Sequence, residues 1–224
     1  PMTLCFKLEN VDTERIPPRD EVQRLYDAAK DAGRISSPRS DILSFGWMEP
    51  DVVHFNSTRV IHHRAIDGES LSDAEMVGRA QMRELVDFLR ADVPGYANAT
   101  LRSVGTQIGI RESRRVRGEA YLTREAFSER RKCDDGICRV WYGIDIHNPN
   151  GTGTELKHLP VGEYYEVPYG CIVPMGCDTL LIGSRSISVD HAIHSSARVM
   201  PPVCSIGQAA GLRRRWRSIA VWRR

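Results

Sequence analysis

One long amphipathic helix among short strand patterns constrains the fold of this 224-residue chain more than any other feature. Its apolar side chains recur at helical spacing and form a broad stripe: Met76, Val77, Ala80, Met82, Leu85, Val86 and Leu89. A capping box, Ser72-Asp73-Ala74-Glu75, predicts the start of this helix, and Pro94-Gly95 follows its predicted end near Ala91. A stripe this wide has to be buried in a core, so other elements must cover it.

The elements predicted around this helix are mostly short. Residues 3–9 alternate as in a strand, and two further strand patterns cover residues 42–46 and 52–55. A second helix is predicted from residue 20 to residue 32, because Pro17-Pro18 precedes an apolar helical pattern and Gly33 follows it. The first hundred residues therefore predict strands packed against two helices.

The second half of the chain predicts more strands than helices. Strand patterns cover residues 105–118, which are dense in arginine, residues 139–147, and residues 163–173 with a break at Pro168. Thr123 is the predicted cap of a short helix that ends near Arg130. An apolar strand at 178–183 precedes a helix that opens at Met200-Pro201-Pro202 and runs through small residues to Gly211. The fold class expected from both halves is α+β or α/β.

The charge of the chain is concentrated at its C-terminus. The formal net charge is +2, yet the last twelve residues hold six arginines and no acid. Without them, 25 basic residues face 29 acidic ones, a net charge of −4. Because the body is mildly acidic, the basic isoelectric point is no argument for nucleic-acid binding by the whole chain. The tail, residues 213–224, leaves a nucleic-acid or membrane-surface arm open as one interpretation.

The cysteines and the hydropathy pattern indicate a cytoplasmic location. Six cysteines at irregular spacings are too few for a disulfide scaffold, and the Cys133/Cys138 pair has no second pair to complete a metal site. We therefore expect reduced cysteines and no bound metal. There is no apolar run long enough to span a membrane, and Pro1-Met2-Thr3-Leu4 does not resemble a signal peptide.

Two strand patterns carry side chains suited to chemistry. Arg111 and Arg114 lie in the arginine-dense pattern, where alternation would send them to opposite faces, and arginine binds carboxylate or phosphate with two hydrogen bonds. Asp145 and His147 would share one face, so that the carboxylate could tune the imidazole as an acid or base. The structural alternatives stay open: a solvated edge strand paired with acids, and a surface aspartate beside a hydrogen-bonded histidine.

Two C-terminal features have weaker signals. His191 and His194 are three residues apart, but without a nearby third ligand this spacing does not indicate a metal site. The helix that opens at Met200-Pro201-Pro202 has a partial positive charge at its start, which favours an anionic or electron-rich group such as the pyrimidine edge of a flavin. A plain Ala/Gly helix packed on a sheet is the alternative.

Several motifs in a fixed order resemble the C-terminal half of an FAD-dependent oxidoreductase. They are Gly109-Ile110-Arg111-Glu112-Ser113-Arg114-Arg115 with Gly118-Glu119, Tyr121-Leu122-Thr123, Asp145-Ile146-His147, Val167-Pro168-Tyr169, Val173-Pro174, the run from Leu181 to Ser188, and Arg198-Val199-Met200-Pro201 with Gly207-Gln208-Ala209-Ala210-Gly211. The group is the heterodisulfide-reductase-like one, with a glutathione-reductase-type FAD fold. The resemblance is strong over about residues 100–212 and weak over the first hundred.

The resemblance implies FAD as the cofactor and assigns roles to residues. Gly183, Ser184 and Arg185 would lie beside the ribityl and phosphate chain. Met200, Pro201 and Pro202 would contact the isoalloxazine, and the helix that follows, with Ser205, Gly207 and Gln208, would point at the flavin C2 carbonyl. Substrate-facing roles would fall to Arg111, Arg114, Asp145 and His147. Residues 1–165 would form a β-rich substrate or cap domain, and residues 166–212 the C-terminal strand and helix of a Rossmann-like FAD domain.

Two departures from the family pattern matter. No Gly-x-Gly-x-x-Gly motif follows a strand anywhere in the chain, so the usual pyrophosphate site is missing, and no cysteine set for an iron–sulfur cluster is visible. The tail also replaces the small apolar residues expected after Gly211 with arginines, for which a frameshifted C-terminus is our hypothesis. We therefore expect a fragment of a flavoprotein that transfers an electron pair between an organic substrate and flavin. A non-catalytic remnant, or a subunit that needs a separate FAD-binding chain, is the alternative.

Overall fold

The computed structural model describes residues 1–147, 153–177 and 179–221, with the backbone alone for His147 and residues 213–221. These residues form two compact units. The N-terminal unit consists of residues 1–111 and 147–153, and the C-terminal unit of residues 112–146 and 154–224. Along the sequence, the main boundary between the units falls between Arg111 and Glu112. The predicted domains 1–165, 166–212 and 213–224 are defined by role and stay predictions.

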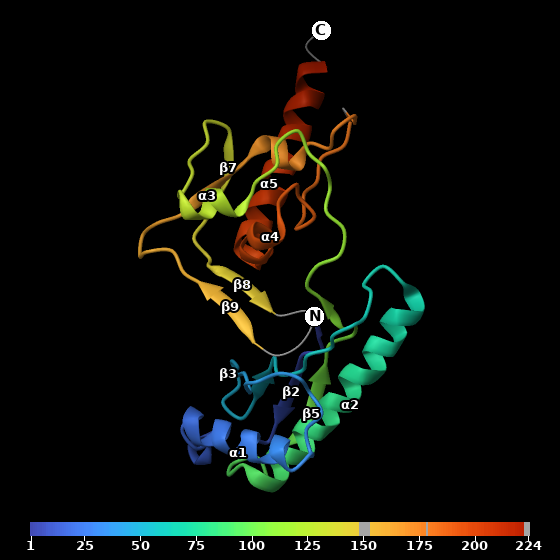
Figure 1. Cartoon of the computed structure of the whole chain (residues 1–224), viewed down its shortest axis with the longest axis vertical. Coiled ribbons are helices and arrows are strands. Elements are labelled where there is room, and N and C mark those ends of the chain that lie inside the picture. The colour runs from blue at the N-terminus through green and yellow to red at the C-terminus, as the bar shows by residue number, and fades with distance from the viewer. Residues whose placement is uncertain (148–152, 178, 222–224) are drawn as a thin grey trace. The chain divides into compact units, whose positions relative to one another are not determined.

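A four-stranded antiparallel sheet organises the N-terminal unit, in the order β3-β4-β2-β5. The strands are β2 (Phe6–Glu9), β3 (Ser44–Gly46), β4 (Val53–Phe55) and β5 (Thr100–Val104), and a separate pair joins β1 (Met2–Thr3) to β6 (Gly109–Ile110). Helices α1 (Arg19–Asp31) and α2 (Gly68–Asp92) share one hydrophobic core with the sheet (Figure 1). The predicted strands and both helices are confirmed, except that residues 3–9 contain the last residue of β1 and the whole of β2.

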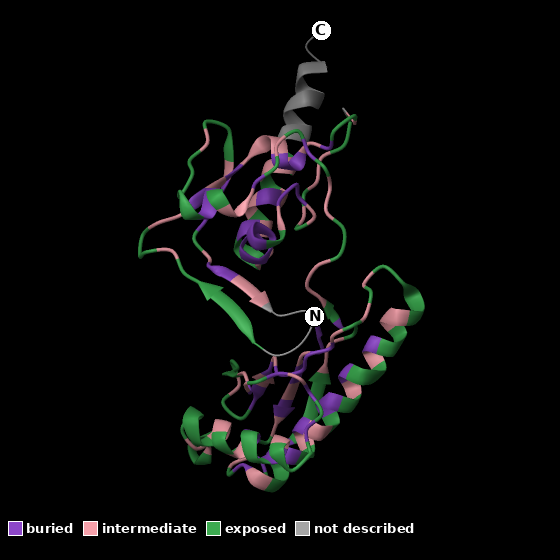
Figure 2. Ribbon diagram, in the orientation of Figure 1, coloured by how far each residue is buried: buried purple, intermediate pink, exposed green. Residues whose placement is uncertain are grey.

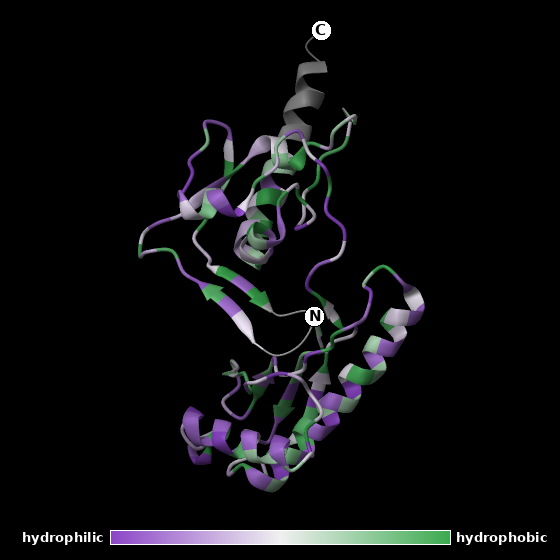
Figure 3. Cartoon of the chain, viewed as in Figure 1, coloured by the Kyte–Doolittle hydropathy of each residue, from purple (hydrophilic) through white to green (hydrophobic). Residues whose placement is uncertain are grey.

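The apolar stripe of α2 supplies much of the core of this unit. Leu85 and Leu89 are fully buried among strand residues, and Figure 2 shows buried positions recurring along the helix. From the sheet, Phe6 and Phe55 stack with ring centroids 5.0 Å apart. Helix α1 is mostly hydrophilic, as Figure 3 shows, and buries Tyr26 and Ala29. The stripe therefore packs as its width predicts.

The predicted start of α2 is wrong by one turn. The helix begins at Gly68, because the Asp67 carboxylate accepts a hydrogen bond from the Ser70 N–H at 2.8 Å. The Ser72 hydroxyl, which the capping box predicted as the cap, donates to the Gly68 carbonyl inside the helix.

We expect Asp67→Ala to lower the free energy of unfolding by about 1 kcal/mol, because a helix-start N–H loses its acceptor. Urea unfolding measures this change. Asp67→Asn is the matched control, since its side-chain oxygen can still accept the hydrogen bond. An equal loss in both variants would show that the cap does not stabilise α2.

The described residues of the C-terminal unit form two strand pairs, three α-helices and a 3-10 helix, η2 (Tyr169–Ile172). β7 (Gly136–Val140) pairs with β10 (Tyr165–Pro168), and β8 (Ile144–His147) pairs with β9 (Thr154–Lys157). The helices are α3 (Arg124–Ser128), α4 (His191–Ala197) and α5 (Met200–Val221). The core includes Tyr165, Val140, Ile193 and Ile206, so strand pair β7–β10 packs with α4 and α5. The mixed content of both units confirms the α+β class.

Four strand predictions in this half need correction. The strand predicted at 163–173 covers only β10, because residues 169–172 form a 3-10 helix. Residues 139–147 are not one strand, because 141–143 separate β7 from β8. Residues 179–183 are not a strand; of their backbone N–H groups only that of Ile182 finds a described backbone partner, the Ile172 carbonyl at 2.9 Å, and one bond makes no ladder. Residues 111–117 are also irregular, because strand pairing in that region ends at Ile110.

Among the helices that the structure describes, none is both long and apolar enough to cross a membrane.

Candidate functional site

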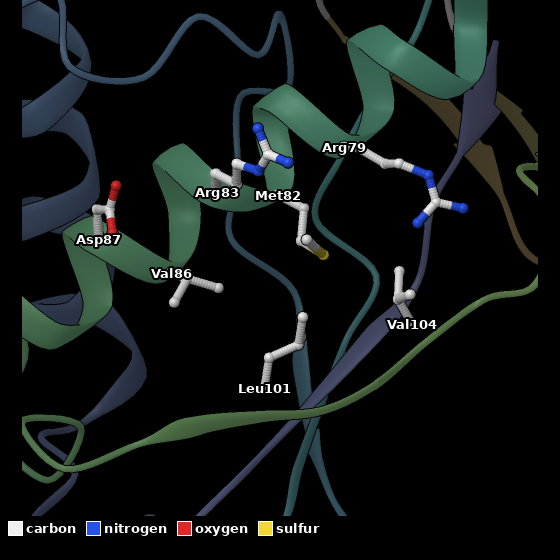
Figure 4. A pocket seen from close by; sticks show the side chains of 7 residues that line it. All are labelled: Arg79, Met82, Arg83, Val86, Asp87, Leu101 and Val104. Atoms are coloured by element: carbon white, nitrogen blue, oxygen red, sulfur yellow. The ribbon is translucent and has the colours of Figure 1, made fainter. Parts of the chain in front are cut away.

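Two cavities in the described parts of the molecule contain none of the predicted site residues. One, of about 420 Å³, lies between α2 and β5; Met82, Val86 and Leu101 line it, with Arg79 and Arg83 among its polar residues (Figure 4). The other, of about 600 Å³, lies around Trp141 and residues 158–164. The predicted cofactor-binding residues lie elsewhere, on residues 183–185 and on α5.

Glycines bring the segment before α4 close to α5. A Cβ atom placed on Gly183 would lie 3.3 Å from the Ala210 Cβ and 3.5 Å from the Gly207 Cα. A Cβ on Gly207 would lie 3.5 Å from the Gly183 carbonyl oxygen. The small residues of α5 thus allow the close approach of this segment, which is irregular rather than the predicted strand.

The start of α5 is open to solvent. Met200 is 82% exposed and Pro201 is exposed, while Pro202 is buried. Prolines carry no N–H group, and the Val203 N–H already donates to the Val199 carbonyl, so the first turn offers at most the N–H groups of Val199 and Met200. This helix start can therefore attract an electron-rich group by its dipole and by two donors.

The remaining predicted cofactor residues lie nearby on the same two segments. Arg185 and Gln208 are exposed. The Ser184 hydroxyl accepts from the Ser186 N–H at 3.2 Å, and the Ser205 hydroxyl donates to the Pro201 carbonyl at 3.3 Å. Their roles toward FAD stay predictions.

The four predicted substrate-facing residues do not form one group. Arg111 belongs to the N-terminal unit and donates to the Thr3 hydroxyl at 2.8 Å, whereas Arg114 belongs to the C-terminal unit and is exposed. Because residues 111–117 are not a strand, the predicted alternation of faces is wrong. Asp145 lies in β8, where its N–H donates to the Ser195 hydroxyl at 3.2 Å. The side chain of His147 lies outside the described residues.

Glu112 is the centre of a polar cluster that the sequence did not single out. Its Oε2 atom lies 2.5 Å from His191 Nδ1 and 3.9 Å from His194 Nδ1, and its Oε1 atom lies 3.2 Å from an Arg115 guanidinium nitrogen. Arg198 completes the set: its N–H donates to the His194 carbonyl at 3.0 Å and its guanidinium donates to the Asp145 carbonyl at 3.2 Å. We call these five residues, Glu112, Arg115, His191, His194 and Arg198, the His194 cluster.

Burial and positive charge keep His194 neutral. Its side chain is 2% exposed, and its pKa is lowered to about 4, with burial as the largest cause. The guanidinium groups of Arg198, Arg115 and Arg185 contribute to this lowering, whereas the Glu112 carboxylate opposes it. Burial also lowers the pKa of Arg198, against the charges of Asp145 and Glu112. Asp145 and Arg185, both predicted site residues, thus act on the His194 cluster.

The signals for this cluster were present in the sequence but separated along it. His191 and His194 are three residues apart, and Glu112, which joins them in the fold, is 79 residues away from His191 in sequence. In the described residues, no group of three or more potential ligands is arranged for a metal. The cluster brings carboxylate, imidazole and guanidinium groups together.

A family model described as FAD dependent oxidoreductase matches residues 1–214 of the chain. Comparisons with curated proteins and with solved structures give no match.

Proposed function

The chain belongs to the family of FAD-dependent oxidoreductases, and we propose that it contributes the flavin-ring end of an FAD site in an enzyme similar to the heterodisulfide-reductase-like group. FAD is the cofactor of the family, and when bound it accepts or donates the electron pair. The start of α5 would face the isoalloxazine, and Arg185 would lie on the side of the phosphates. The pyrophosphate would be held outside the residues described here, by another segment or a separate chain.

The distribution of acids at the helix starts carries this proposal. Among the α-helices of the described residues, α5 is the one with no acid at its start. The others have acids in their caps or first turns: Asp20 and Glu21 in α1, Asp67 and Glu69 in α2, Glu125 in α3, and Asp190 in α4. Carboxylates at a helix start repel a phosphate, and they accept hydrogen bonds from the backbone N–H groups that would otherwise bind it. Among the described helices, the start of α5 therefore suits the flavin ring. The starts of the other described helices do not suit the pyrophosphate, because they carry acids.

The experiment compares FAD with riboflavin, which lacks the pyrophosphate and the adenosine. We expect the purified chain to bind the two with similar, weak affinity, measured by quenching of flavin fluorescence, because α5 would contact the shared ring. A companion chain that carries a glycine-rich strand–turn–helix should raise FAD affinity by about tenfold or more and leave riboflavin binding unchanged. FAD bound far more tightly than riboflavin by this chain alone would overturn the divided site.

An acid at the start of α5 tests the placement of the ring. We expect Met200→Asp to weaken riboflavin binding about three- to tenfold, because the carboxylate occupies the positive end of the helix. Met200→Asn separates this charge effect from the loss of the methionine contact. Val161→Asp, at a fully exposed position, adds the same charge elsewhere. Equal weakening by Met200→Asp and Val161→Asp would contradict the placement.

A further inference from the structure

One carboxylate oxygen lies between an exposed and a buried imidazole in the His194 cluster. The side chain of His191 is 53% exposed, that of Glu112 is 21% exposed, and that of His194 is 2% exposed. His191 Nδ1 and Glu112 Oε2 are within hydrogen-bond distance at 2.5 Å, whereas His194 Nδ1 lies 3.9 Å from the same oxygen. The three groups are therefore neighbours whose exposure decreases from His191 through Glu112 to His194.

We propose that His191, Glu112 and His194 are a proton path between solvent and the reacting centre, an inference that rests on the proposed function. Reduction of a neutral organic substrate by a hydride leaves an anion that takes up one proton, and oxidation by loss of a hydride releases one proton. In the first direction His191 takes a proton from water and passes its Nδ1 proton to Glu112 Oε2. Glu112 then protonates His194 Nδ1, and His194 releases a proton from its other ring nitrogen.

The state of His194 suits a transient carrier better than a structural residue. Its Nδ1 atom is buried without a hydrogen-bond partner, whereas a buried polar atom that serves structure is normally paired. Closing the 3.9 Å separation to hydrogen-bond distance needs a shift of about 1 Å by one side chain. The charged groups that face His194 are Glu112 and Arg115 before α3, Arg185 before α4, and Arg198 after α4. Because the arginines disfavour the imidazolium, a proton that reaches His194 is released readily.

The position of the cluster relates it to the proposed flavin side. Arg198 is hydrogen-bonded to the His194 carbonyl, and α5 begins two residues after it. A metal site made of the same three side chains does not fit, because two ligands of one tetrahedral zinc ion lie about 3.3 Å apart at bond lengths near 2.0 Å. At 2.5 Å, His191 Nδ1 and Glu112 Oε2 are at hydrogen-bond distance instead.

The first test follows the histidine ring nitrogens by NMR in the chain without flavin. In Glu112→Gln we expect the His191 Nδ1 signal to lose its hydrogen-bond shift. The titration of His194 should move to lower pH, because the nearby negative charge is removed. Glu119→Gln, in the same segment and exposed, is the matched control and should change neither signal. A Glu112→Gln variant in which His194 is unaffected would overturn the path.

The second test uses the flavin-loaded enzyme. We expect His191→Ala to lower kcat about a hundredfold with little change in KM, and imidazole in the buffer to restore the rate. A structural role would not be rescued by free imidazole. His158→Ala, an exposed histidine outside the cluster, should retain its rate. A His191→Ala enzyme with full activity would refute the path, whereas failure of riboflavin binding at α5 would refute the proposed function and leave the NMR result standing.

Discussion

Gly118→Ala should destabilise the C-terminal unit by about 3 kcal/mol, because a Cβ atom has no room there. It would lie 2.7 Å from the Gly170 carbonyl oxygen, 2.9 Å from the Ser188 Cβ and 3.1 Å from the Val173 carbonyl oxygen. Two of these three atoms belong to the backbone, so no side-chain rotation relieves the contact.

The backbone around Gly118 cannot shift without losing hydrogen bonds. The Glu119 N–H donates to the Val173 carbonyl at 2.9 Å and the Ala120 N–H to the Gly170 carbonyl at 3.1 Å. The loss of each such bond costs about 1 kcal/mol, which adds to the overpacking. Urea unfolding, together with hydrogen exchange at the buried amides of Val140 and Val167, measures the effect in this unit.

Gly211→Ala is the matched control for this substitution. Gly211 lies inside α5, and a Cβ there would meet nothing within 4 Å. Alanine at this position should stabilise the chain by about 0.5–1 kcal/mol, because glycine is the poorer helix former. If both variants had the same stability, the close approach at Gly118 would not exist.

The second large effect is a loss of stability at acid pH that depends on His194. The pKa of His194 is about 4 in the folded chain, against an ordinary value of 6.5. Between these values the unfolded chain binds the proton and the folded chain does not, so the free energy of unfolding rises with pH. The stability present at pH 7 should therefore fall by up to about 3 kcal/mol as the pH is lowered toward 4.

The measurement compares urea unfolding at pH 7 and pH 4.5 in the parent chain and in His194→Gln. The variant cannot be protonated at this position, so its stability should vary less over the same range. His54→Gln is the control, since it removes another histidine with a lowered pKa. Burial and Lys7 lower the pKa of His54, which lies in the N-terminal unit rather than in the His194 cluster. A His194→Gln variant with the full pH dependence of the parent would contradict a buried neutral histidine.

Local patterns predicted the regular elements better than the site. The stripe from Met76 to Leu89 could be recognised as a helix because its period belongs to the segment itself. The strand predicted at 178–183 was wrong over the described residues 179–183, because a strand also needs partners and the apolar run contains no information about them. The start of α2 was misplaced because both Asp67 and Ser72 are good caps, and only the folded backbone shows which side chain meets a free N–H.

The sequence by itself determined the family, the mixed α+β class, and the small-residue helix that begins at Met200. Those properties follow from motif order, periodicity and residue size, which are written along the chain. Only the tertiary structure decided that Arg111 and Arg114 belong to different units and that Glu112 joins His191 to His194. A charge acts over a few ångströms in space whatever its distance in sequence, so the partners of a buried imidazole depend on which segments the fold brings together.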